Sequence, residues 1–79
     1  MPRPLRLLCD ASGRPKLLYW HGGRYPVASI LERWKDAGRW WAGESPKLFF
    51  RLRTVDGALW EIYRDGDAPG AWYLYRLYD

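Results

Sequence analysis

The 79-residue sequence contains no asparagine and no glutamine, and it has a single cysteine and a single histidine. One cysteine excludes an intrachain disulfide and favours a reducing compartment, so we expect a cytoplasmic protein. No apolar run is long enough for a signal peptide or a membrane span, and no membrane partner is expected. The absence of thermolabile amides is typical of heat-adapted proteins and predicts a thermophilic source.

The same scarcity argues against an enzyme. Cys9 and His21 are expected in different strands, and no third side chain is evident to orient the histidine of a nucleophilic pair. A small buried cysteine and a histidine at a strand end are the simpler interpretation. One cysteine and one histidine are also too few ligands for a zinc site. The segment RDGDAPG (residues 64–70) lacks most ligands of a calcium loop, so we interpret it as a solvated turn and expect no metal, cofactor or small-molecule substrate.

Aromatic rings and arginine are abundant instead. The chain has six tryptophans, six tyrosines and two phenylalanines, and ten of its thirteen cationic side chains are arginine. A domain of this size buries only roughly 60% of the surface of its unfolded chain, so several rings must stay partly exposed. The net charge of +4 favours an anionic partner. A guanidinium both stacks on rings and binds phosphate or carboxylate through two hydrogen bonds.

Short apolar and aromatic runs alternate along the chain with glycine, proline and aspartate. This pattern predicts one all-β domain over residues 1–79, an antiparallel curled sheet or barrel of five or six strands. Gly22 and Gly23 are expected to form a two-residue hairpin turn, because glycine accepts the positive φ values that such turns need.

Residues 27–36 allow two interpretations. Their apolar side chains fall at i, i+3, i+4 and i+7, the spacing of an amphipathic helix: Val27, Ile30, Leu31 and Trp34. The alternative is a long strand that continues from the hairpin and is bulged near Ser29. We favour the strand because a glycine hairpin needs a partner strand of matching length.

The Asp56-Gly57 hairpin allows the strand register to be argued. A two-residue turn mixes core and surface residues, whereas a three-residue loop over 55–57, with glycine left-handed, separates them. The three-residue loop pairs Leu52 with Trp60 and Phe50 with Ile62 on one face. It pairs Phe49 with Tyr63, Arg51 with Glu61 and Arg53 with Leu59 on the other. The predicted core consists of Leu48, Phe50, Leu52, Trp60 and Ile62.

The outward face combines arginine with aromatic side chains. The candidate binding residues are Arg39, Trp40 or Trp41, Phe49, Arg51, Arg53 and Tyr63. Such a face suits single-stranded nucleic acid, whose bases stack on rings while guanidinium groups neutralise phosphates. Tryptophan, tyrosine and arginine are equally the usual hot-spot residues of protein interfaces. A purely structural interpretation is also open, in which Arg51 and Glu61 form a cross-strand pair and Phe49 and Tyr63 lie under the loop over 35–46.

The residue order RW…RWWAGES…FFRLRTVDGALWEIYRDG…AWYLYRLYD resembles a small domain at the C-terminus of ImuB-like proteins. These are catalytically inactive relatives of Y-family polymerases that assist mutagenic translesion synthesis, and similar short proteins of unknown function occur as free-standing chains. The resemblance implies a DNA-repair setting but no activity and no binding residues. We therefore expect a non-enzymatic binding or adaptor module connected with DNA damage tolerance, whose partner is single-stranded DNA or a DNA-repair protein.

Overall fold

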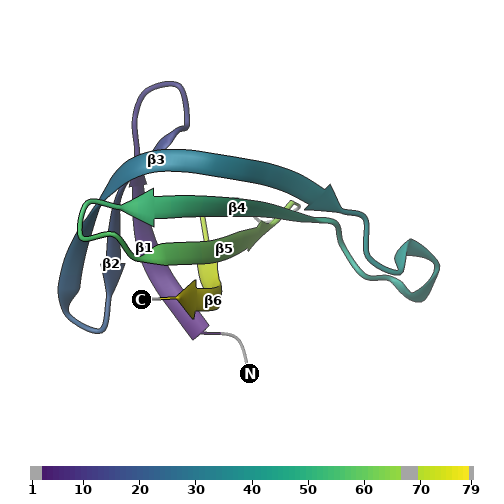
Figure 1. Cartoon of the computed structure of the whole chain (residues 1–79). Helices are drawn as coiled ribbons and strands as arrows, with labels where there is room; N and C mark the ends of the chain where they lie inside the picture. Colours follow the sequence, from purple (N-terminus) through teal and green to yellow (C-terminus); the bar gives the residue numbers. More distant parts are fainter. Residues whose placement is uncertain (1–2, 67–69, 79) are drawn as a thin grey trace.

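The computed structural model describes residues 3–66 and 70–78, apart from the side chain of Trp40. In this part of the chain six strands follow one another: β1 (Arg3–Cys9), β2 (Pro15–Trp20), β3 (Gly23–Asp36), β4 (Lys47–Thr54), β5 (Leu59–Asp65) and β6 (Trp72–Tyr78). Each strand pairs antiparallel with the next, and β1 pairs with β6 to close a barrel (Figure 1). The predicted all-β class is confirmed. The described part contains no α-helix, and so no helix long and apolar enough to cross a membrane.

Strand β3 is long because successive parts of it pair with two different strands. Its first residues, Gly23 to Pro26, pair with β2, and the rest, from Val27 to Asp36, pairs with β4. The register shifts between Val27 and Ser29 and again between Ile30 and Glu32. Each shift is a bulge, which bends the strand and increases its twist. The prediction of a strand bulged near Ser29 is confirmed.

The bulges also explain why this strand imitates a helix in the sequence. Each bulge adds one residue, so Val27, Ile30 and Arg33 lie opposite Thr54, Leu52 and Phe50, which all belong to one face of β4. A face that recurs every three residues resembles the periodicity of a helix more than the alternation of a regular strand. The helical interpretation of residues 27–36 is wrong for this reason.

The glycine hairpin was predicted one residue too late. Trp20 pairs with Gly23, so the two turn residues are His21 and Gly22, whose φ angles are +48° and +79°. Positive φ at both positions is typical of the tight turn that suits the twist of a hairpin. Gly23 is needed for packing instead, because a Cβ atom there would lie 2.6 Å from the hydroxyl oxygen of Tyr25.

The register predicted for β4 and β5 is confirmed at every pair. Leu52 lies opposite Trp60 and Arg51 opposite Glu61, and Gly57 has the left-handed φ of +92° that the three-residue loop requires. Four of the five predicted core residues are buried, and Leu48 is half-buried against them. The core cluster is Leu18, Phe50, Leu52, Ala58, Trp60, Ile62, Trp72 and Leu74.

Beyond the barrel, β3 and β4 run on as an arm that ends in the 3-10 turn η1 (Trp40–Ala42), at the right of Figure 1. The Arg39 amide donates a hydrogen bond of 2.7 Å to the Glu44 carboxylate, which closes the tip of this arm.

Candidate interaction surface

An aromatic row crosses the outer face of strands β3 to β6. We define it by its five residues: Trp34, Phe49, Tyr63, Tyr73 and Tyr75. Trp34 lies opposite Phe49, Phe49 opposite Tyr63, and Tyr63 opposite Tyr73. The ring centroids of these three pairs are 5.1, 5.4 and 5.4 Å apart, and Tyr75 meets Phe49 edge-on at 5.3 Å. These spacings are those of favourable aromatic contacts, so the row is a packed layer of rings.

Phe49 is the centre of this layer and is only 7% exposed, although its side chain points away from the barrel core. The rings of Trp34, Tyr63 and Tyr75 cover it. The sequence-based expectation that Phe49 offers an open outward ring is wrong, because its neighbours on three strands enclose it. Tyr75 remains 43% exposed, and Trp34, Tyr63 and Tyr73 are half-buried. Their rims form the accessible part of the row.

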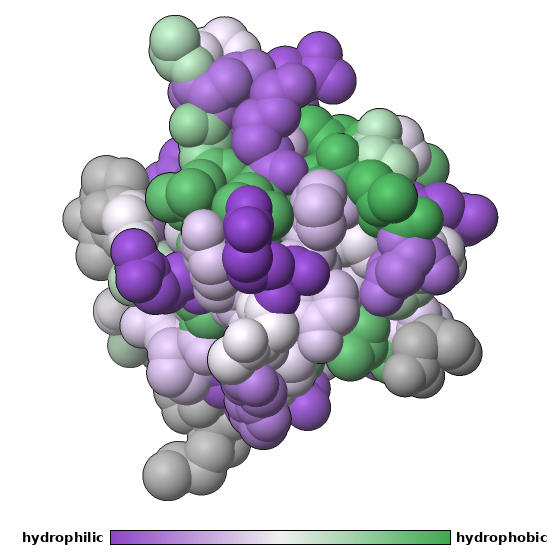
Figure 2. Space-filling model, turned by 90° about the vertical axis from the view of Figure 1, so that its left-hand side faces the viewer, coloured by the Kyte–Doolittle hydropathy of each residue, from purple (hydrophilic) through white to green (hydrophobic). Residues whose placement is uncertain are grey.

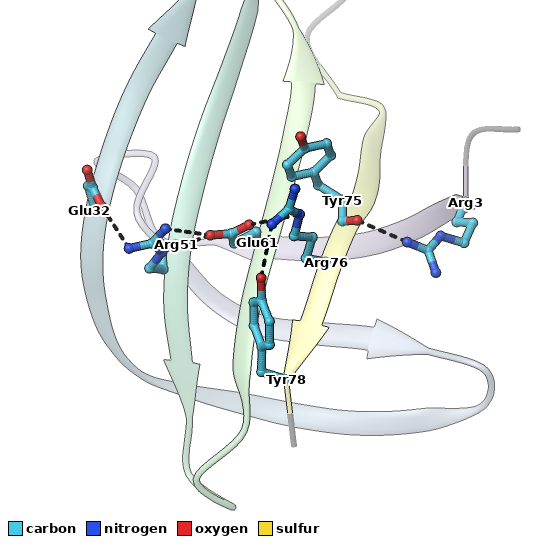
Figure 3. A network of polar contacts seen from close by, with 7 residues as sticks. All are labelled: Arg3, Glu32, Arg51, Glu61, Tyr75, Arg76 and Tyr78. Carbon is cyan, nitrogen blue, oxygen red and sulfur yellow. Dashed lines mark hydrogen bonds and ion pairs between the residues drawn. The ribbon is translucent and has the colours of Figure 1, made fainter.

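A charged row runs beside the aromatic row on the same four strands (Figure 3). It consists of Glu32, Arg51, Glu61 and Arg76, which lie opposite one another in that order. The Arg51 guanidinium is 3.1 Å from the Glu32 carboxylate and 2.6 Å from that of Glu61. Arg76 approaches the other oxygen of Glu61 at 4.0 Å. Charges of opposite sign therefore alternate across the sheet, as favourable cross-strand pairs do.

Arg51 is engaged on both sides in this row. The hydrogen bond to Glu61 is the main reason why the pKa of the Arg51 guanidinium is raised, and the charges of Glu61 and Glu32 add to the effect. Its carbon Cζ also lies 5.8 Å from the centre of the Trp34 ring. The predicted cross-strand pair of Arg51 and Glu61 is confirmed. A phosphate at this position has to compete with two carboxylates.

The other predicted site residues lie in two places. Arg53 is exposed on β4 beyond the charged row, and Tyr63 belongs to the aromatic row. Arg39 and Trp41 belong to the arm, where Trp41 is 71% exposed. The side chain of Trp40 lies outside the described part of the structure. The structure thus brings Phe49, Arg51 and Tyr63 together and places the two arm residues beyond the end of the rows.

Sequence reasoning missed five members of the two rows. Trp34 was considered as part of an apolar helix face only in the interpretation that was not favoured, Glu32 was given no role, and Tyr73, Tyr75 and Arg76 were left in the last strand without one. The alternation in WYLYRLY (residues 72–78) was an available signal, since Trp72 and Leu74 are buried while Tyr73 is half-buried and Tyr75 is exposed.

Cys9 and His21 are not neighbours in the barrel. Cys9 pairs with Pro15 at one end of β2, and His21 follows the other end, on the order of 20 Å away at ~3.3 Å per residue. Cys9 is exposed, so its predicted burial is wrong. Partial desolvation, followed by the charge of Asp10, raises the pKa of the Cys9 thiol, which disfavours the reactive thiolate. His21 stacks on Trp20 with the ring centroids 4.1 Å apart.

Metal ligands are equally dispersed. No group of three or more histidine, cysteine, aspartate or glutamate side chains lies together among the described residues. The segment over 64–70, interpreted above as a solvated turn, lies partly outside them.

Comparison with protein families shows where the chain belongs. The family described as domain of unknown function DUF6504 matches residues 3–79. The chain belongs to the DUF6504 family. No curated protein and no solved structure matches this DUF6504 chain. The match does not connect the DUF6504 domain to ImuB-like proteins, so that resemblance remains a prediction.

The charge of this DUF6504 domain is unevenly distributed. Residues 1–30 contain five lysine and arginine side chains and one carboxylate, Asp10, whereas residues 31–79 contain eight of each sign. The whole net charge therefore comes from β1, β2 and the beginning of β3. The two rows described above lie in the balanced part. At the end of the barrel with the β2–β3 and β4–β5 turns, Figure 2 shows hydrophilic side chains interspersed with small separate apolar patches.

Proposed function

We propose that the chain is a non-enzymatic adaptor module and that a partner protein binds across the aromatic row. Half-buried tyrosine and tryptophan rims supply large, amphipathic contact area of the kind that dominates protein interfaces. Packing against Phe49 already orders the rings of Trp34, Tyr63 and Tyr75. An ordered surface loses little side-chain entropy on binding, which favours affinity.

The observation that carries this choice of partner is the position of Arg51 between Glu32 and Glu61. Nucleic-acid affinity comes largely from cations that replace the counterions of phosphates. The Arg51 guanidinium lies 5.8 Å from the centre of the Trp34 ring, and two carboxylates already neutralise it. Arg76, whose Cζ lies 5.2 Å from the centre of the Tyr75 ring, is 4.0 Å from the same Glu61 carboxylate. A polyanion on this face meets those carboxylates as well, whereas a protein surface can match alternating charges.

The setting we propose is DNA damage tolerance, with a DNA-repair protein as the partner. This part of the proposal is supported by the sequence resemblance to the C-terminal domain of ImuB-like proteins. Those proteins are inactive themselves and assist other proteins, which fits an adaptor.

Tyr75→Ala tests the proposed surface, because Tyr75 is the most exposed ring of the row. The tagged wild-type chain and the variant are cross-linked to their partners in native host cells and the partners are quantified. We expect Tyr75→Ala to reduce recovery of a repair protein by about tenfold, as loss of a hot-spot residue does. The control is Val55→Ala, since Val55 is 68% exposed on the β4–β5 turn. Equal recovery with Tyr75→Ala in a folded variant contradicts the surface, and a partner set without repair proteins contradicts the setting.

A second candidate function, contact with single-stranded nucleic acid, is favoured by the charge of residues 1–30. An open groove of about 290 Å³ lies on this basic side and is lined by Arg6, Tyr19, Trp20 and His21, among others. The Arg6 guanidinium lies 5.6 Å from the centre of the Tyr19 ring, and Trp20 stacks on His21. Rings and a cation in one groove can stack bases and neutralise phosphate.

This candidate is tested by titrating a thymidine oligonucleotide at about 50 and 200 mM salt while following tryptophan fluorescence. Nucleic-acid contact predicts quenching that weakens steeply with salt and is reduced by Arg6→Glu. Arg53→Glu makes the same charge change on the outer face of β4. If Arg53→Glu reduces the quenching more than Arg6→Glu does, the contact lies on the outer face predicted from sequence. Binding that does not depend on the salt concentration excludes contact with nucleic acid.

A further inference from the structure

A pocket opens where β2 and β3 separate. The two strands pair from Trp20 and Gly23 as far as Leu17 and Pro26, after which the bulged part of β3 continues along β4 alone. The cavity between the diverging strands has a volume of about 310 Å³. Residues 12–14 of the β1–β2 turn and Pro15 at the start of β2 line one side, and Ile30, Arg33 and Phe50 line the other. We call it the wedge pocket.

The wedge pocket combines an apolar lining with two cations. Phe50 is 6% exposed and belongs to the barrel core, and the half-buried Ile30 packs against that core. Arg14 and Arg33 are exposed on either side. Within residues 3–66 and 70–78, neither guanidinium forms an ion pair, in contrast to Arg51. A ligand group that is both apolar and anionic matches this lining.

The carboxylate of the β1–β2 turn does not neutralise these cations. Asp10 accepts hydrogen bonds from the Ser12 amide, the Ser12 hydroxyl and the Arg14 amide, and its other oxygen lies 3.9 Å from Lys16. These bonds hold the turn that presents the Arg14 side chain. Glu32, the carboxylate next to Arg33 in the sequence, is directed to Arg51 on the outer face.

The backbone beside the pocket has an open edge. From Val27 onwards β3 pairs with β4, and no second strand in the described part of the chain pairs with its other edge. Unpaired N–H and C=O groups along a strand edge are a template for an added strand. The bulges at Ala28 and Leu31 interrupt the regular hydrogen-bonding pattern of this edge, so that backbone pairing along it is short and does not discriminate between sequences. Selectivity then has to come from the side chains of the pocket.

We propose that the wedge pocket binds an extended acidic segment of a partner protein. An apolar side chain of the segment lies on Phe50 and Ile30, and a carboxylate bridges the Arg14 and Arg33 guanidinium groups. The segment pairs with the open edge of β3 between the hairpin turn and the arm. A polypeptide fits better than a nucleic acid, because only a peptide backbone offers alternating donors and acceptors to this edge. The site is separate from the aromatic row and does not depend on that row being an interface.

The proposal is tested by an NMR titration of the ¹⁵N-labelled chain with an acetylated hexapeptide of alternating valine and glutamate. We expect saturable amide shifts confined to residues 10–16 and 29–35, and slower hydrogen exchange of the open-edge amides. The same peptide with lysine in place of glutamate is expected to leave the spectrum unchanged. Arg33→Glu is expected to weaken binding at least about tenfold, because it replaces a charge-assisted contact by repulsion. Arg24→Glu, at an exposed arginine near the other end of β3, is the matched control and is expected to bind like the wild type.

Four results overturn the proposal. They are equal binding of the lysine peptide, unchanged affinity in a folded Arg33→Glu variant, amide shifts that map outside the pocket, and full affinity of a glutamate peptide with alternate amides N-methylated. The last result excludes backbone hydrogen bonds between the peptide and β3. A thymidine oligonucleotide that displaces the peptide and loses its binding in Arg33→Glu identifies nucleic acid as the occupant, which also overturns the proposal.

Discussion

Arg51 donates two hydrogen bonds to a single oxygen of Glu61, from Nε at 2.9 Å and from Nη2 at 2.6 Å. The Glu61 side chain is only 6% exposed, whereas that of Glu32, on the other side of Arg51, is 54% exposed. A buried carboxylate has lost its hydration and depends on its partner, while an exposed one is hydrated with or without it. The two contacts of Arg51 therefore differ in their importance for folding.

This asymmetry predicts that Arg51→Ala destabilises the barrel clearly more than Glu32→Ala. Removing both members of the buried pair, in Arg51→Leu/Glu61→Leu, is expected to recover much of the loss, because no unpaired buried charge remains. Urea unfolding of the three variants measures the free energies. Equal losses for Arg51→Ala and Glu32→Ala contradict the assignment.

Thr54 joins the β4–β5 turn to the core. The Trp60 indole N–H donates a buried hydrogen bond of 3.0 Å to the Thr54 hydroxyl, which in turn donates to the Asp56 carboxylate. Thr54→Val leaves the indole N–H without an acceptor and is expected to cost about 1–3 kcal/mol in the free energy of unfolding. Thr54→Ser keeps the acceptor and is the control. Faster hydrogen exchange of the Trp60 indole in the valine variant alone confirms the cause, and equal exchange in both contradicts it.

Phe49 should behave as a core residue although it faces outward. The residue is only 7% exposed beneath the neighbouring rings, and Phe49→Ala is expected to destabilise the protein by about 3–5 kcal/mol, as truncation of a buried ring does. Val55→Ala, at an exposed position of the neighbouring turn, is expected to change stability by less than about 0.5 kcal/mol. Thermal and urea unfolding compare the two, and a small effect at Phe49 rules out a packed aromatic layer.

Acid is expected to weaken the β1–β2 turn through Asp10. The hydrogen bond from the Ser12 hydroxyl, followed by that from the Arg14 amide, lowers the pKa of Asp10 below its ordinary value. The unfolded chain therefore protonates first as the pH falls. The contribution of Asp10 to stability is complete well above a pH of about 3.9 and is lost as the pH falls through the lowered folded-state pKa.

Urea midpoints measured between about pH 6 and pH 3 check this linkage. The wild type is expected to lose more stability over that interval than Asp10→Asn, which has no carboxylate to protonate. Parallel pH profiles of the two proteins contradict a role for Asp10.

The register of β4 and β5 was predictable because one loop length separates apolar from polar side chains and the other mixes them. The β2–β3 turn was misplaced by one residue, since glycine is used there for two different reasons: Gly22 has a positive φ, and Gly23 lies against the Tyr25 ring. The second reason involves a packing contact that the order of residues does not display. The bulges of β3 are likewise not visible in the order of residues. They give its apolar side chains a helix-like spacing, because a strand of shifting register has no fixed period.

The sequence by itself determined the class of the fold, the β4–β5 pairing and the confinement of the net charge to residues 1–30. These follow from alternation, turn chemistry and composition, which are local properties of the chain. Only the tertiary structure decided that Phe49 is covered, that Arg51 is neutralised and that Arg14 and Arg33 border one pocket. Each of these three features depends on which strands become neighbours when the barrel closes. A side chain on such a strand is in contact with residues that are distant in the sequence as well as with residues of its own strand.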